Sequence, residues 1–366
     1  MTRTLDALWE KLVQHRIVEG NRPGLSTDDN PWYLRLLSAF SGWIAALFLI
    51  AFLFSLFSSL LKSVTANVLI GIALLFLAHL ALKRQNAEFL SHAALAISLA
   101  GQALVIYALA KVFEPQFALL ALSVAALEAL LFIVMRSYIH RVFCAFCTCA
   151  AIYFAANYGA STTMTIGAYG VQHALIVAGL ALLAAWLWLN EFQQTNYREL
   201  FHPLSWGVSL ALVTFGSFAI FVPDQRFAGS TNEHVPALHW LSEALVGIVL
   251  VWVVSQILKR REHLTQAVKL MWLFTAAIFS LVSLAAPGIA LGLIIVVVGY
   301  HQQNRLLLGI GFIALGAYLS RYYYSLDQSL AYKSAVLLAC GIFCFLIRGL
   351  LRRVGSRHLP GNGVTR

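Results

Sequence analysis

The chain has 366 residues, of which 60% are hydrophobic and only 11% are charged, and its mean hydropathy is +0.80. A soluble domain is about 25% charged. This composition excludes a soluble globular protein, because polar side chains are too few to cover the apolar surface, and it predicts an all-α protein whose solvent is lipid. The formal net charge of +10 is explained below by the position of Lys and Arg relative to the membrane, so we expect no nucleic-acid partner.

Residues 1–30 are predicted to form a cytoplasmic amphipathic helix followed by a linker. Apolar residues recur there at helical spacing, at Leu5, Leu8, Trp9, Leu12 and Val13. Such a helix lies on the membrane headgroups, or it docks against a partner or against its own bundle. The first long apolar run starts only after about 35 residues and has no small-residue cleavage site, so we expect no cleaved signal peptide.

Twelve apolar stretches follow, and a membrane-spanning helix needs about 20 such residues. They lie at 36–60, 64–82, 89–110, 117–135, 138–157, 173–190, 204–222, 238–257, 268–285, 287–300, 305–324 and 330–349. Pro287-Gly288 breaks the chain before the short stretch at 287–300, so it and 268–285 could instead form a re-entrant hairpin buried against protein. We predict a polytopic transmembrane helix bundle at 31–350 and a basic cytoplasmic tail at 351–366.

The distribution of Lys and Arg predicts that both termini are cytoplasmic. With the N-terminus inside, the inner segments hold 20 of the 25 Lys and Arg residues, and the other 5 are outside: Lys62, Lys111, Arg226, Arg321 and Lys333. Basic residues concentrate on the cytoplasmic side of membrane proteins. All loops are short, and no Walker loop, GxSxG or HExxH motif is present, so we do not expect an enzyme.

Glu128 is the clearest candidate for a functional residue. It lies inside the stretch at 117–135 and is flanked by Ala125, Ala126 and Ala129. A carboxylate at that depth is costly, by about 2.5–3.5 kcal/mol on insertion scales, so Glu128 should face the bundle interior, where small neighbours let another helix approach. The residue is either a hydrogen-bonded structural glutamate or a proton or cation site on a pathway.

Glu243 lies one turn after His239, so the two side chains share a helical face near the outer end of their span. They form either an ordinary interfacial pair or a proton-handling or ligand-binding contact.

His140, Cys144 and Cys147 also share one helical face, and Cys340 and Cys344 repeat part of this spacing. His and thiolate groups so spaced could hold zinc or an iron–sulfur cluster. However, the predicted topology places them on the inner side, where thiols stay reduced, and a free cysteine packs as a small apolar residue. We therefore expect structural cysteines, with no metal and no other cofactor.

Aromatic and charged side chains crowd together between the last two predicted spans. The group comprises Arg321, Tyr322, Tyr323, Tyr324, Asp327 and Lys333. Its members form either an aromatic belt at the outer membrane surface, with Asp327 paired to a cation, or a binding surface for an outer partner or ligand. Tyrosine suits both roles, because it combines a rigid apolar ring with a polar tip.

Two motifs carry a resemblance to a known family. The first is Asn30-Pro31-Trp32-Tyr33-Leu34-Arg35-Leu36-Leu37 leading to Gly42-Trp43, and the second is Tyr322-Tyr323-Tyr324-x-Leu-Asp-x-Ser-Leu-x-x-Lys333-Ser334 with Gly341 and Arg348. The chain resembles, over nearly its whole length, an uncharacterised domain-of-unknown-function family of bacterial multi-span inner-membrane proteins. The resemblance implies that location and a possible partner, since members are often encoded beside a smaller membrane protein with a GDYxxLxY repeat. It implies no activity.

Two functions stay open from the sequence. The chain is either a non-catalytic component of a membrane complex, assembled through its tyrosines or its N-terminal helix, or a secondary transporter of a small solute with Glu128 as a proton or cation site. Transporters tend to have internal repeats and broken helices near the midplane. The sequence shows one break, at Pro287-Gly288, without a copy in the first half, and this favours the complex component.

Overall fold

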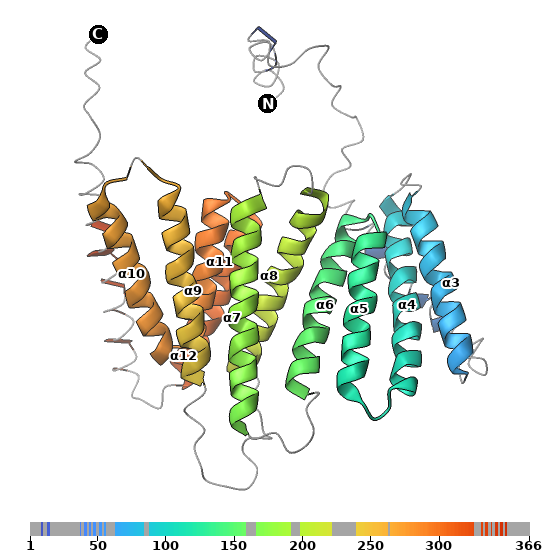
Figure 1. Ribbon diagram of the computed structural model, residues 1–366. Helices are drawn as coiled ribbons and strands as arrows, with labels where there is room; N and C mark the ends of the chain where they lie inside the picture. Colours follow the sequence, from blue (N-terminus) through green and yellow to red (C-terminus); the bar gives the residue numbers. More distant parts are fainter. Residues whose placement is uncertain are drawn as a thin grey trace.

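The computed structural model describes residues 63–83, 88–158, 166–191, 198–221, 239–262 and 264–325, together with single positions between 9 and 55 and between 331 and 349. Within these residues the protein is all-helical, with ten helices and no strand (Figure 1). Eight of the ten are long and apolar enough to cross a membrane. The prediction of an all-α bundle with helices that could span a membrane is therefore confirmed for the described part of the chain.

Each of the ten helices overlaps one predicted span. In chain order they are α3 (Val64–Lys83), α4 (Glu88–Val112), α5 (Phe117–Val134), α6 (Tyr138–Tyr158), α7 (Ile166–Asn190), α8 (Arg198–Phe221), α9 (His239–Lys259), α10 (Gln266–Ala285), α11 (Ile289–His301) and α12 (Arg305–Ser325). Successive helices run in opposite directions (Figure 1). The predicted spans at 36–60 and 330–349 lie mostly outside the described residues.

Two clusters of buried apolar side chains hold the bundle together, and α6 contributes to both. The larger cluster is formed by the seven helices from α6 through α12, and it includes Tyr153, Trp188, Leu212, Leu250 and Ile294. The smaller cluster joins α3, α4, α5 and α6 and includes Leu75, Ala78, Val105, Met135 and Cys144. Helix α6 therefore connects an N-terminal group of helices to a C-terminal group.

Basic side chains gather at one end of the bundle, the end drawn at the top of Figure 1. Because successive helices reverse direction, this end collects the last turns of α3 and α9, the first turns of α6, α8, α10 and α12, and the α5–α6 connection. It holds Lys83, Arg136, Arg141, Arg198, Lys259, Arg260, Arg261, Lys269 and Arg305, whereas the described residues of the opposite end include only Lys111 and Arg321. We call the first end the basic end.

Ala286, Pro287 and Gly288 break the chain between α10 and α11 at the end opposite the basic end. Gly288 has φ of +91°, a conformation that favours glycine. A Cβ atom on Gly288 would also lie 2.6 Å from the ring of Tyr318. Helix α11 has 13 residues and packs against α12 and α9 far more than against α10. The two helices that flank the break therefore diverge instead of pairing along their lengths.

Candidate functional site

A buried polar cluster connects α4, α5 and α6. Glu128 on α5 is only 1% exposed. Its carboxyl group lies near the thiol of Cys144 on α6. The Oε2 atom of the same carboxyl group is buried and has no hydrogen-bond partner among the described residues. The prediction that Glu128 faces the bundle interior is therefore confirmed, and one of its oxygens is left without a bond.

His140 lies one turn before Cys144 and is fully buried. Its Nδ1 atom lies 3.3 Å from Cys144 Sγ, and its Nε2 atom lies 2.8 Å from Ser98 Oγ and 3.1 Å from Gln102 Nε2. An amide nitrogen can only donate, so the Nε2 atom of His140 accepts from Gln102 and the ring proton lies on Nδ1, facing the thiol. The bonds therefore run in one direction, from Gln102 through His140 to Cys144, whose thiol lies near Glu128.

This cluster places two titratable side chains, Glu128 and His140, on either side of one thiol. Neither forms an ion pair with any described residue. A proton can therefore be held on the Glu128 carboxyl group or on the His140 ring. The thiol of Cys144 lies between these two groups. The chemistry available to the cluster is proton binding and proton transfer between neighbouring groups.

Sequence reasoning identified Glu128 and the shared face of His140, Cys144 and Cys147, but it did not bring them together. Ser98 was missed entirely, because one serine in an apolar helix gives no signal of its own. The described residues contain no group of three His, Cys, Asp or Glu side chains that could hold a metal ion. Cys340 and Cys344 lie outside the described residues.

A second buried carboxylate, that of Glu243, lies at the break between α10 and α11. Its Oε1 atom accepts a hydrogen bond from the backbone N–H of Gly288 at 3.1 Å, and its Oε2 atom accepts from the Ser283 hydroxyl. Ser283 Oγ in turn accepts from the N–H of Ala290 at 3.2 Å. Glu243 therefore caps the N-terminus of α11, where the helix dipole stabilises a negative charge. Its predicted pairing with His239 stays a prediction, because that side chain lies outside the described residues.

The tyrosine-rich end of α12 is divided between the bundle interior and the surface. Tyr318 is 1% exposed, and its hydroxyl oxygen lies 2.7 Å from Ser217 Oγ on α8, so this tyrosine belongs to the core. Tyr322 and Tyr323 are half-buried. Tyr324 is 76% exposed, and its ring meets that of Tyr323 edge-on.

The charged neighbours of these tyrosines are described only in part. Arg321 is exposed, and its Nε atom donates to the carbonyl oxygen of Ile220 at 3.3 Å. Asp327 and Lys333 lie outside the described residues, so the predicted ion pairs between Asp327 and the two cations stay a prediction. The last turns of α12 are therefore anchored to α8 through Tyr318 and Arg321.

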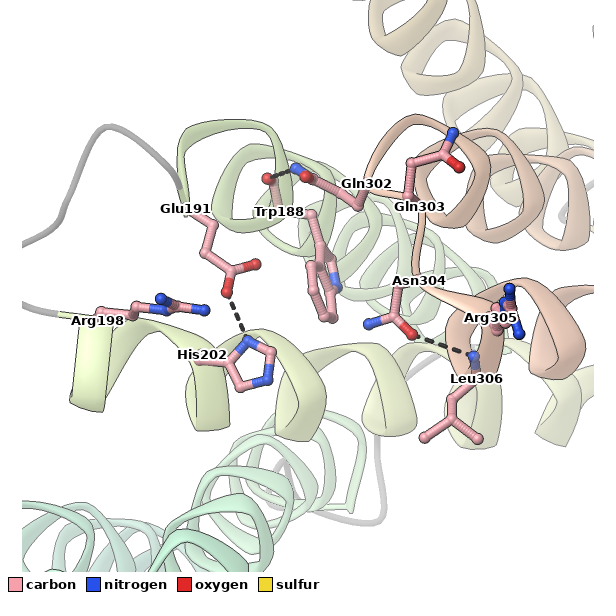
Figure 2. A pocket seen from close by; sticks show the side chains of 9 residues that line it. All are labelled: Trp188, Glu191, Arg198, His202, Gln302, Gln303, Asn304, Arg305 and Leu306. Carbon is pink, nitrogen blue, oxygen red and sulfur yellow. Dashed lines mark hydrogen bonds and ion pairs between the residues drawn. The ribbon is translucent and has the colours of Figure 1, made fainter. Parts of the chain in front are cut away.

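A cavity of about 370 Å³ lies at the basic end, between α7, α8 and the connection from α11 to α12 (Figure 2). It is lined by Trp188, Glu191, Arg198, His202, Gln302, Gln303, Asn304, Arg305 and Leu306. The side-chain amide of Gln302 donates to the backbone oxygen of Trp188 and so ties α11 to α7. Sequence reasoning missed this cavity, because its lining joins residues 188–202 to residues 302–306, about 100 positions later in the chain.

Comparison with known proteins identifies a family without an assigned activity. The family model of a domain of unknown function (DUF4401) matches residues 31–354. No curated protein and no solved structure matches the chain.

Proposed function

We propose that this chain, which belongs to the DUF4401 family, is a multi-span protein of the bacterial inner membrane that works as a secondary transporter of a small solute, with Glu128 as its proton site. The observation that carries the proposal is the buried Oε2 atom of Glu128, which lacks a hydrogen bond among the described residues. An unsatisfied buried polar atom costs about 1–3 kcal/mol. A glutamate kept only for structure would be expected to use both oxygens.

The cluster around Glu128 supports a path for the proton. Hydrogen bonds run from Gln102 on α4 through His140 to Cys144 on α6, and the thiol of Cys144 lies near Glu128 on α5. Ionisable groups inside membrane spans are rare, face the interior and mark ion or proton pathways. In this account Glu128 binds the proton, and His140 is the positioning residue that orients the thiol of Cys144 toward the carboxyl group.

A second buried carboxylate gives further support. Glu243 is 9% exposed and accepts a hydrogen bond from Gly288 at the N-terminus of α11. Ionisable groups inside membrane spans mark ion or proton pathways. The sequence showed the break at Gly288 but not its contact with Glu243, and two buried carboxylates favour the transporter over the complex component.

The proposed topology has twelve spans and cytoplasmic termini, with the basic end of the bundle in the cytoplasm. The positive-inside rule supports this orientation. The position of Gly288 at the end opposite the basic end supports two full passes for α10 and α11, because a re-entrant hairpin would turn back near mid-membrane. We propose that the protein catalyses no chemical reaction and binds no cofactor.

The test is transport by vesicles that contain the purified protein. An inward proton gradient is imposed, and the movement of labelled amino acids, sugars and organic acids is measured. We expect gradient-driven movement of one class, its loss in Glu128→Gln, and its retention in the control Glu114→Gln. Glu114 is a matched control because its side chain is 68% exposed and sits at the turn after α4. Equal transport by Glu128→Gln and the wild-type protein would contradict the proposal.

The second candidate is a non-catalytic component of a membrane complex. The specific observation that favours it is the 76% exposed ring of Tyr324 beside the exposed Arg321. A tyrosine with an arginine neighbour is typical of interface anchors. The resemblance stated above suggests the partner, a smaller membrane protein with a GDYxxLxY repeat. Absence of transport, together with retention of this partner during purification, would favour this candidate.

A further inference from the structure

The cavity at the basic end brings two arginines and two helix N-termini together. Arg198 is the first residue of α8 and Arg305 is the first residue of α12. They lie on opposite sides of the cavity (Figure 2). Neither guanidinium forms an ion pair with a described residue. A cation at a helix N-terminus is unfavourable, because the helix dipole already places positive charge there. Two such placements around one cavity suit an anionic ligand.

The net charge of the lining is positive. Arg198 and Arg305 contribute +2 and Glu191 contributes −1, so these three residues together carry +1. Glu191 is only 7% exposed, and its Oε1 atom lies 2.5 Å from Nδ1 of His202. The carboxylate is therefore held by the imidazole ring, not by either arginine, and both guanidinium groups stay available to a ligand.

Asn304 adds a neutral donor with a fixed direction. Its Oδ1 atom accepts hydrogen bonds from the backbone N–H groups of Leu306 and Leu307, both at 3.1 Å, and so caps α12. Because the oxygen is used by the cap, the amide NH₂ group is the end that faces the cavity, as Figure 2 shows. The indole of Trp188, fixed by a 2.8 Å hydrogen bond to Ser209, forms a rigid wall beside it.

We propose that this cavity binds a phosphate group, carried by a phospholipid headgroup at this end of the bundle or by a soluble phosphate ester. Guanidinium groups match phosphate oxygens with paired hydrogen bonds. Arg198 lies on one side of the cavity, and Asn304 and Arg305 lie together on the other (Figure 2). A tetrahedral phosphate can present an oxygen to each of them, whereas a planar carboxylate has only two oxygens in one plane. The volume of about 370 Å³ is in the range of small-molecule sites.

The test uses the full-length protein purified in detergent. Phosphatidylglycerol is titrated by native mass spectrometry, and glycerol phosphate and inorganic phosphate are tested by calorimetry. Wild-type protein is compared with the double variant Arg198→Gln/Arg305→Gln and with the control Arg136→Gln, an exposed arginine at the same end but outside the cavity. We expect the double variant to bind about tenfold more weakly or worse, and the control to bind as the wild-type protein does.

A second variant separates binding from folding. Aspartate is as good a helix cap as asparagine, so Asn304→Asp should preserve the cap and the melting temperature. It replaces the NH₂ donor with a negative charge and should weaken phosphate binding by a similar factor. Binding of phosphatidylglycerol alone identifies the headgroup as the ligand, and displacement of the lipid by glycerol phosphate identifies a soluble ester. If no phosphate probe binds, or if the double variant binds as tightly as Arg136→Gln, the proposal is wrong.

Discussion

The guanidinium of Arg141 on α6 donates a hydrogen bond to the carbonyl oxygen of Glu199, 2.9 Å away in the first turn of α8. In a regular helix that carbonyl accepts from the N–H group four residues later, but residue 203 is proline and has no N–H. The Nε atom of Arg141 also donates to the carbonyl oxygen of Met135, at 2.9 Å, just after α5. One buried side chain therefore completes the hydrogen bonding of two other helix ends.

This relationship predicts that Arg141→Gln destabilises the bundle. The change leaves the buried carbonyl oxygen of Met135 and the part-buried one of Glu199 without this donor, at a cost of about 1–3 kcal/mol, and should lower the melting temperature measured in detergent. Adding Pro203→Ala should recover part of the loss, because alanine supplies the missing N–H for Glu199. A double-mutant cycle measures this coupling. Additive effects of the two changes would show that Arg141 does not compensate for the proline.

The break before α11 predicts a strong requirement for glycine at position 288. Gly288→Ala must adopt a positive φ and place a Cβ atom against Tyr318, so we expect a loss of about 1–3 kcal/mol in stability. Gly309→Ala is the matched control, because a Cβ atom there meets nothing within 4 Å. Thermal unfolding of both variants checks the prediction, and equal melting temperatures would refute it.

At the tyrosine-rich end of α12, we expect one tyrosine to be needed for binding a partner and another to be needed for the stability of the bundle. Tyr324→Leu should leave membrane insertion and abundance unchanged, yet it should release a partner that copurifies through the exposed ring. Tyr318→Phe removes the hydroxyl group bonded to Ser217 and should lower the melting temperature while the partner is kept. The broader change of Tyr322, Tyr323 and Tyr324 to leucine should also lose the partner. Retention of every partner in both tyrosine-to-leucine variants would leave only the aromatic-belt interpretation.

The distribution of basic residues predicts the sidedness of the loops. Reporter fusions at residue 366 and within 157–172 should report opposite sides of the membrane, with residue 366 in the cytoplasm. The same side for both fusions would contradict the proposed topology.

The helices were predictable because membrane spans impose a length and a composition that can be recognised one segment at a time. The stretch at 138–157 shows this, since α6 runs from Tyr138 to Tyr158. The start of α7 was less accurate: the helix begins at Ile166, before the predicted start at 173, because polar residues such as Gln172 are tolerated near a span end. Segment composition therefore fixes where a helix lies better than where it begins.

Of the buried polar cluster, the sequence predicted only the residue whose burial in a membrane costs the most free energy, the glutamate. A carboxylate inside a span stands out, so Glu128 was identified, but its partners His140 and Cys144 come from another helix. Arg141 matters because Pro203 has no N–H to donate to the Glu199 carbonyl. In the sequence alone, Arg141 was only one of many basic residues near the predicted inner side. Contacts between helices depend on how each helix is rotated about its axis and how deep each residue lies in the membrane. The sequence of a single segment determines neither.

The most direct test of the proton site is the charge displaced by a pH jump across vesicles that contain the purified protein, recorded without any solute. Wild-type protein should give a transient current as protons bind at Glu128, and Glu128→Gln should abolish it while Glu114→Gln leaves it intact. Yields and melting temperatures of the two variants should match, so that the loss reports proton binding. A current of the same size in Glu128→Gln would show that Glu128 is not the proton site.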